Sequence, residues 1–398
     1  MDKCGPGRAA LPSRLGITPM APATRIAIVI NQDQMWKNHV DVFAGAYTHA
    51  RRRGWIVDAL AFSSQVPQGR AATDRYQGII ARADTRLQAI ARATGLPVVN
   101  VWRSSPATRL PLVAPDFVRT GELAGEHLRA RGFRRFTYIG YRGIVSTELE
   151  RGFRRAVGDG ECSRILIPRA FSESSRLFEA FDRTLTTWLK TLRPPVGVFT
   201  FDDLVARYLV NDAVRSGIAV PHDLAVVGYA NEEPYCLRPE PSLTSIDLAY
   251  GRVGERAVAI LDDLMQGRPA PDGPVLVPPA ELVPRESTDV FASADPLVAE
   301  ALRFMSDNSH RPIRVADVVR KTGALGRTLA RHFQRERGCR VVDELTRMRI
   351  ARAKRMLVEG DASIKQVARA CGFANGIRLV VAFRKQEGMT PSEFRARK

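Results

Sequence analysis

The chain has 398 residues, a length that predicts two or three domains rather than one. Hydrophobic residues make up 45% of the chain and charged residues 26%, a balance that excludes a disordered or collagen-like protein. Sixty Lys and Arg stand against 42 Asp and Glu, and the net charge of +18 favours a polyanionic partner, with nucleic acid first.

The N-terminal segment, residues 1–24, is rich in Gly, Pro and Ala and is expected to be a flexible extension. It lacks the apolar core of a secretory signal, and the longest apolar run, residues 26–30, is too short to span a bilayer. The five cysteines form no CxxC pair and the six histidines have no metal-ligand spacing. We expect a cytoplasmic protein without a disulfide framework, metal or cofactor.

Residues 25–288 alternate between short β-branched runs and helical patterns, which predicts a parallel α/β fold. An irregular Pro-rich stretch, residues 105–115, favours two lobes over one. Ligands of such folds bind beyond the carboxyl ends of the strands. The strands are predicted at 25–30, 55–62, 77–80, 97–101, 135–139, 164–167, 196–200 and 224–227. The helices are predicted at 40–53, 85–93, 118–131, 148–157, 173–191, 203–216 and 251–266.

The pattern changes after residue 288. Residues 289–294 are a predicted linker, and residues 295–398 show helical periodicity alone, which predicts a separate all-α domain. This domain holds 23 Lys and Arg against 11 Asp and Glu, so most of the positive excess lies here. A solvated basic surface is the alternative, which this concentration at one end disfavours.

The helical domain repeats a helix-turn-helix pattern, first over residues 315–333 and again over 364–383. Gly323 and Gly372 are 49 residues apart, whereas Phe333 and Phe383 are 50 apart, so the second turn has one extra residue. Each glycine allows the sharp turn at positive φ. A predicted helix over residues 342–357 joins the two copies and would hold them rigidly, about 34 Å apart, in successive major grooves.

The second helix of each copy is expected to enter the DNA major groove. Arginine can read guanine there and asparagine can read adenine. Two helical hairpins with no DNA role are the alternative, which the duplication and the basic charge disfavour. The outward positions are Gly326, Arg327, Thr328 and Arg331 in the first copy and Asn375, Gly376 and Arg378 in the second.

These segments resemble the AraC/XylS family of bacterial transcription regulators. The resemblance rests on RIARAKRML at 349–357, IKQVARACGF at 364–373 and GMTPSEFR at 388–395. Two residues depart from the family: Leu325 replaces the usual Ser before the first recognition helix, and Val381 stands where a basic residue is frequent.

Residues 25–288 resemble the sensor domain of LacI/GalR regulators and periplasmic binding proteins. The matching segments are RTGELAGEHL at 119–128, GFRRFTYIG at 132–140, ERGF at 150–153, FDD at 201–203, GIAVPHDLAVVG at 217–228, LTSI at 243–246 and REST at 285–288. The resemblance implies two lobes that close on a ligand, with crossovers near residues 112–116, 239–245 and 275–279.

A neutral sugar needs paired donors and acceptors around an aromatic plate. The resemblance places Arg151, Asp203 and Asn231 at the ligand. Positions at strand ends add Asn31, Gln32, Trp102, Asp116 and Phe201. The alternatives are that Asp203 caps a helix, that Arg151 forms a surface ion pair and that Trp102 packs within its lobe.

The sequence thus predicts an α/β two-lobed periplasmic-binding-protein-like sensor followed by an all-α domain with two helix-turn-helix motifs. The two resemblances imply a transcription activator that responds to a sugar such as xylose, with double-stranded DNA, a monosaccharide, a second copy of the chain and RNA polymerase as partners. Ala230 stands where many relatives have a sugar-binding Asp, and Arg103 follows Trp102, so another pentose or an acidic sugar is an alternative effector. Repression is an alternative to activation.

Two other classes fit less well. A solute-binding protein would need an export signal and would leave the helical domain unexplained. An enzyme would need a motif such as GxxxxGK[ST], HExxH or GxSxG, and the sequence contains none of these.

Overall fold

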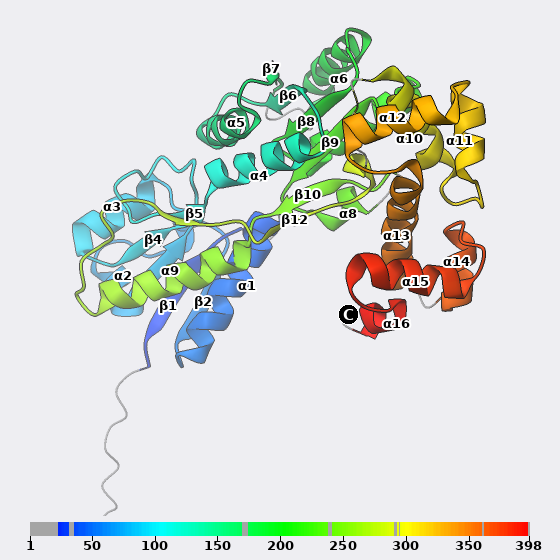
Figure 1. Ribbon diagram of the computed structural model, residues 1–398. Helices are drawn as coiled ribbons and strands as arrows, with labels where there is room; N and C mark the ends of the chain where they lie inside the picture. The colour runs from blue at the N-terminus through cyan, green and yellow to red at the C-terminus, as the bar shows by residue number, and fades with distance from the viewer. Residues whose placement is uncertain are drawn as a thin grey trace, which may run out of the picture. The chain divides into compact units, whose positions relative to one another are not determined.

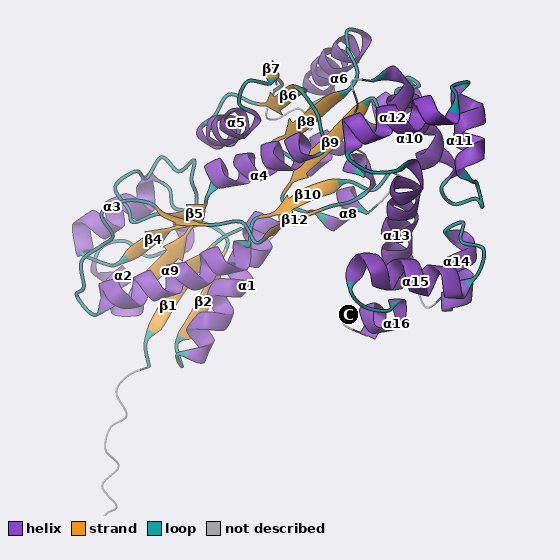
Figure 2. Cartoon of the chain, in the orientation of Figure 1, coloured by secondary structure: helices purple, strands orange, loops and turns teal. Residues whose placement is uncertain are grey.

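The structure is a computed structural model that describes residues 23–31, 36–168, 174–237, 241–289, 293, 295–359 and 362–396. It confirms the predicted fold class, since parallel sheets covered by helices are followed by a segment in which every described element is a helix (Figure 2). Two compact units can be separated. Of the described residues, the first contains 23–31, 39–113 and 251–274, and the second contains 36–38, 114–250 and those from 275 onward.

The first unit is built on a four-stranded parallel sheet in the order β2-β1-β3-β4. Its strands are β1 (Arg25–Val29), β2 (Ile56–Leu60), β3 (Gly78–Ala81) and β4 (Val98–Asn100), with helices α1 (Lys37–Arg52), α2 (Arg70–Arg75), α3 (Thr85–Thr94) and α9 (Tyr250–Met265) and the short 3-10 turn Ser63–Gln65. Helices α1 and α9 pack closely because a methyl group on Gly45 or Gly254 would collide with the backbone of the other helix.

The second unit begins with a six-stranded sheet in the order β12-β10-β9-β8-β6-β7, in which only β12 runs antiparallel to its neighbour. Its strands are β6 (Arg135–Gly140), β7 (Glu161–Leu166), β8 (Val196–Thr200), β9 (Leu224–Tyr229), β10 (Thr244–Asp247) and β12 (Glu281–Val283). The helices are α4 (Phe117–Ala130), α5 (Ile144–Val157), α6 (Ser175–Lys190), α7 (Asp203–Arg215) and α8 (Glu233–Cys236), followed by the 3-10 turn η2 (Glu286–Thr288). Two short strands, β5 (Val113–Pro115) and β11 (Val275–Val277), pair with each other.

Apart from the short piece Trp36–Asn38, the chain passes between the two units at residues 113/114, 250/251 and 274/275. The first and third passages lie in or beside the ranges expected from the sequence. The second lies after the expected 239–245. The reason is that β10 pairs in parallel with β9, so the chain stays in the second sheet until Asp247.

Seven helices follow in the described part of the C-terminal segment: α10 (Pro296–Asn308), α11 (Val315–Thr322), α12 (Gly326–Arg337), α13 (Val341–Glu359), α14 (Ile364–Ala370), α15 (Gly376–Glu387) and α16 (Pro391–Ala396). Helices α10–α12 and α14–α16 lie at opposite ends of α13 (Figure 1). Val341, Leu345 and Met348 pack into the core of the first group, and Ile350, Ala353 and Leu357 pack into the core of the second. Among the described helices, none is both long and apolar enough to cross a membrane.

Candidate DNA-binding and ligand-binding sites

The first helix-turn-helix consists of α11 and α12. Val318, Leu329 and Phe333 are fully buried in its core, and Gly323 makes the turn with φ 62°. With these residues inside, Arg327 and Arg331 are exposed on the opposite side of α12. Gly326 begins the helix and Thr328 is half-buried.

The second helix-turn-helix consists of α14 and α15. Leu379 and Phe383 are fully buried, as their counterparts in the first copy are. Gly372 turns the chain at φ 71°, and α15 begins at Gly376, four residues later, whereas Gly326 follows Gly323 by three. The structure therefore confirms the extra residue in the second turn.

Asn375 lies at the N-cap of α15. Its Oδ1 accepts a hydrogen bond from the backbone N–H of Arg378 at 3.0 Å. A cap of this kind satisfies one of the otherwise unpaired amides of the first turn. The Oδ1 atom is thus engaged as a helix cap, so a two-bond contact with adenine would require this cap to open.

Arg327 and Arg331 of α12 differ from other arginines of the domain in their lack of an acidic partner within the described part of the chain. Arg335 pairs with Asp295 at 2.8 Å and Arg340 with Asp343 at 2.7 Å. Across the described residues, neither an ion pair nor a side-chain hydrogen bond involves the guanidinium of Arg327 or Arg331. Exposed positive charge without an internal partner is suited to DNA phosphates and guanine edges.

Helix α13 connects the two helix-turn-helix units, called here the first head (α10–α12) and the second head (α14–α16). Its 19 residues span about 28 Å at 1.5 Å per residue. Near its middle, Arg349 donates to the carbonyl oxygens of Ser309, Arg311 and Ile313 at 2.9–3.2 Å. The Cα of Gly372 faces the same loop, because an added Cβ would meet the Ser309 and Arg311 carbonyls. The loop at residues 309–313 therefore contacts both helix α13 and the turn of the second helix-turn-helix.

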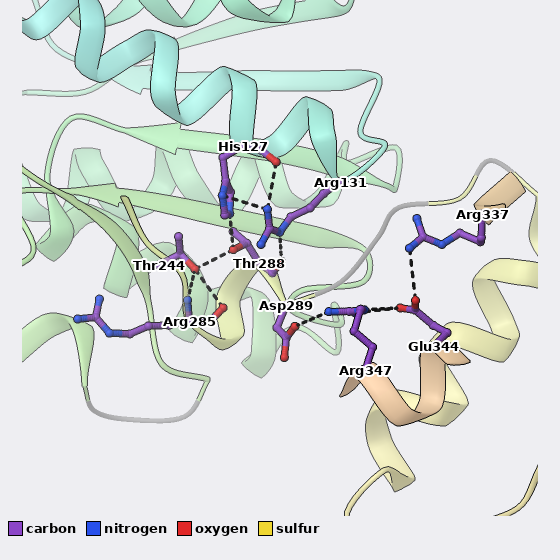
Figure 3. Close-up of polar contacts among 9 residues, drawn as sticks. All are labelled: His127, Arg131, Thr244, Arg285, Thr288, Asp289, Arg337, Glu344 and Arg347. Atoms are coloured by element: carbon purple, nitrogen blue, oxygen red, sulfur yellow. Dashed lines mark hydrogen bonds and ion pairs between the residues drawn. The ribbon is translucent and has the colours of Figure 1, made fainter. Parts of the chain in front are cut away.

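An ion-pair network links the α/β part of the second unit to α13 (Figure 3). Arg347 contacts Asp289 at 3.4 Å and donates twice to Glu344 Oε1, at 2.9 and 3.1 Å. The other oxygen of Glu344 lies 3.5 Å from Arg337. Glu344 is only 3% exposed, so its carboxylate is a buried anion between two guanidinium groups.

The residues before Asp289 are held by hydrogen bonds (Figure 3). Arg131 Nη1 lies 3.0 Å from His127 Nδ1, and an arginine only donates, so Nδ1 accepts and Nε2 carries the proton. His127 Nε2 then donates to Thr288 Oγ1 at 2.8 Å, and Arg131 donates to the Thr288 carbonyl at 2.7 Å. Burial and the charge of Arg131 lower the pKa of His127 to about 3, which keeps the ring neutral.

Two ligand candidates of the first unit are described. The carbonyl of Asn31, just beyond β1, accepts from His39 Nδ1 at 2.6 Å. Trp102 follows β4, and the guanidinium carbon of Arg82 lies 5.1 Å from its ring centre. Asn100 supports this turn by accepting from the Trp102 amide at 3.0 Å. Gln32 lies outside the described residues.

Asp203 is an internal support rather than an exposed ligand group. Its Oδ1 accepts from the Tyr229 amide and from Ser245 Oγ, both at 2.7 Å. Its Oδ2 accepts from the Glu232 amide at 2.8 Å. Burial raises the pKa of Asp203 to about 7. Asp203 does not cap α7 either, because Asp202 does so through the Leu204 amide at 2.7 Å.

The loop that Asp203 holds is strained. Ala230 and Asn231 have φ values of 95° and 53°, a region that side chains other than glycine rarely occupy. Strain of this kind persists only where surrounding contacts impose it, and it gathers at functional sites. Asn231 Oδ1 accepts from Arg285 Nη2 at 2.8 Å. Arg285 is therefore a further candidate, which its place in the REST segment did not single out.

The remaining candidates lie at different positions of the second unit. Phe201 directly follows β8 and packs edge-on against Tyr141, which directly follows β6, at 4.7 Å between ring centres. These two rings form an aromatic wall at the carboxyl ends of the strands. Asp116 caps α4 by accepting from the Arg119 amide at 2.9 Å. Arg151 is exposed on α5, and among the described residues its guanidinium has no ion pair.

Two family models match the chain. A periplasmic binding protein-like domain matches residues 125–288, and a helix-turn-helix domain matches residues 318–397. A protein that joins these two modules is a DNA-binding transcription regulator.

Known proteins place the chain more closely. The xylose operon regulatory protein of Haemophilus influenzae is 26% identical over 384 residues, which cover 93% of this chain and 98% of that protein. Its counterpart in Escherichia coli K12 is 26% identical over 386 residues, covering 93% and 96%. The solved structure of the xylose-binding transcription activator xylR superposes with a TM-score of 0.70 at 23% identity, covering 95% of this chain and 99% of that one. Over almost its whole length the chain is thus similar to XylR-like transcription regulators.

A further relative matches over part of its length. The HTH-type transcriptional regulator GntR of Pseudomonas aeruginosa is 36% identical over 202 residues, 49% of this chain and 57% of that protein. These relatives are regulators by name and not enzymes, in agreement with the sequence analysis.

Proposed function

We propose that this protein is a cytoplasmic, sugar-responsive transcription activator that binds promoter DNA as a homodimer and recruits RNA polymerase. Its relatives named for xylose regulation support a pentose effector. The candidate ligand residues are Asn31, Gln32, Trp102, Asp116, Arg151, Phe201 and Asn231, with Asp203 as the support of the Asn231 loop. The DNA contacts come from the outward faces of α12 and α15.

The observation that carries the regulatory part of the proposal is the short segment 285–289. At one end Arg285 holds Asn231 of the strained loop, and at the other end Asp289 pairs with Arg347 of α13. Only the 3-10 turn η2 separates them. A ligand that moves Arg285 would shift Asp289 as well, and would thereby favour one arrangement of the DNA-binding domain.

An acidic sugar is the second candidate effector. Arg285 brings a guanidinium to the Asn231 loop, and Ala230 provides no carboxylate for sugar hydroxyls. A guanidinium suits an anionic ligand, because charge-assisted hydrogen bonds are strong. The name of the xylose relatives favours a neutral pentose instead.

The test is calorimetric titration of the full-length protein with xylose, arabinose, ribose, gluconate and galacturonate, followed by promoter binding with and without the sugar that binds. A ligand bound to the native state also raises the melting temperature. Arg151→Ala should blunt the response to the sugar and spare DNA binding. Arg327→Ala should relax base preference and leave sugar binding unchanged. Promoter DNA bound no better than random duplex would refute the proposal.

Asp289→Asn tests the coupling. This variant should bind both the sugar and the DNA, because Asp289 contacts neither in the proposal. The change of DNA affinity on adding sugar should shrink. Asp223→Asn is the matched control, because Asp223 also pairs with the helical domain, through Arg303 at 3.0 Å, but lies outside segment 285–289. An equal loss of coupling in both variants would contradict the proposed route.

A further inference from the structure

The two recognition helices begin in the same register but present different chemistry. Both have 12 residues and start at a glycine, Gly326 and Gly376. In each, a Leu and a Phe four residues later are buried, as Leu329 and Phe333 or as Leu379 and Phe383. Positions that precede and follow the buried Leu by two therefore correspond between the heads.

At these corresponding positions the first head has Arg327 and Arg331, and the second has Ile377 and Val381. The Ile377 side chain is 74% exposed and that of Val381 is 60% exposed. They lie four residues apart and so share one face of α15. Large aliphatic side chains on a solvent-facing helix have an unfavourable hydration that a partner can relieve.

The charge around this pair indicates the partner. Arg378, Arg384 and Lys385 are exposed beside the two aliphatic residues on the same helix. Cations of this kind suit a phosphate backbone on either side of a groove. The major groove contains one apolar group, the C5 methyl of thymine, and aliphatic or small side chains recognise it by contact.

We propose, resting on the DNA-binding function, that the second helix-turn-helix reads thymine methyl groups through Ile377 and Val381, while the first reads guanine through Arg327 and Arg331. The regulator then recognises an asymmetric site, with guanine in the half bound by α12 and thymine in the half bound by α15. Asn375 is occupied as a helix cap and plays no part in this readout.

The experiment starts from duplexes that the full-length protein selects from a randomised pool. Deoxyuridine, which lacks only the methyl group, replaces thymine in one half-site at a time. Wild-type protein should bind the substituted half-site about fourfold more weakly for each contacted thymine, the effect of one lost methyl contact. The double variant Ile377→Ala, Val381→Ala should bind the thymine duplex more weakly and should not distinguish thymine from uracil.

Arg327→Ala is the matched control in the other head. It should keep the sensitivity to uracil and reduce the sensitivity of wild type to 7-deazaguanine, which lacks the N7 acceptor. Equal binding of thymine and uracil duplexes by wild type would overturn the inference. So would a uracil effect that persists in the double variant, or a double variant whose only defect is its oligomeric state. A pool that yields no enriched sequence would instead refute specific DNA binding itself.

Discussion

Substituting Glu344 by Gln removes the carboxylate that lies between Arg337 and Arg347, while the side chain keeps nearly the same shape. Glu344 is 3% exposed, and the side chains of its partners Arg337 and Arg347 are 11% and 28% exposed. Two guanidinium groups would then lie in a poorly hydrated site without their common carboxylate. Loss of one member of a buried ion pair costs about 3–5 kcal/mol, so we expect a loss of unfolding free energy in that range.

The assay is urea unfolding of the full-length protein at pH 7, with the loss of helix monitored by circular dichroism. The neighbouring variant Asp343→Asn is the control. Asp343 pairs with Arg340, and the two side chains are 44% and 71% exposed, so the solvent-screened pair contributes only about 0–1 kcal/mol. If Glu344→Gln and Asp343→Asn lowered the unfolding free energy equally, the argument from burial would be wrong.

Three further changes have defined outcomes. Burial holds the pKa of His127 at about 3, below the ordinary 6.5, so the free energy of unfolding falls as the pH drops below 6.5, by about 2 kcal/mol at pH 5. In His127→Gln the unfolding free energies at pH 7 and pH 5, measured by urea titration, should therefore lie closer together. Leu325, the N-cap of α12, makes no side-chain cap, so Leu325→Ser should raise stability by about 1 kcal/mol in thermal unfolding, and a lower melting temperature would contradict this. Gly372→Ala should lower stability more than Gly323→Ala, since both have positive φ but only Gly372 meets neighbouring backbone, and equal melting temperatures would contradict the collision.

Much of the fold follows from local patterns in the sequence. The helices predicted over 203–216 and 251–266 are found as α7 and α9 within one residue at each end. Helix α5 begins four residues earlier than the predicted 148, because Gly143 at its N-cap provides no side-chain acceptor that would announce a start. The short strands β5, β10, β11 and β12 were not predicted, since three or four residues carry too little periodicity to be recognised.

The ligand candidates were harder to predict, because their roles depend on contacts between distant residues. Asp203 follows Phe201 in a motif that indicates a site, yet its oxygens are occupied by Tyr229, Glu232 and Ser245. Arg285 lies 54 residues from Asn231 in sequence. The exposed pair on α15 was visible in the sequence only as a departure at Val381, and its meaning required the register of the two helices.

The anchoring of α13 in two separate cores has a consequence for promoter evolution. Met348 packs into the core of the first group of helices and Ile350 into the core of the second. The number of residues between these two anchor points therefore sets the angle between the two recognition helices. One inserted residue would rotate one head by about 100° relative to the other. A B-DNA duplex turns by about 35° per base pair, so nearly three base pairs of added spacing would be needed to restore the alignment. The distance between the two half-sites of a promoter is thus constrained by the length of a single helix.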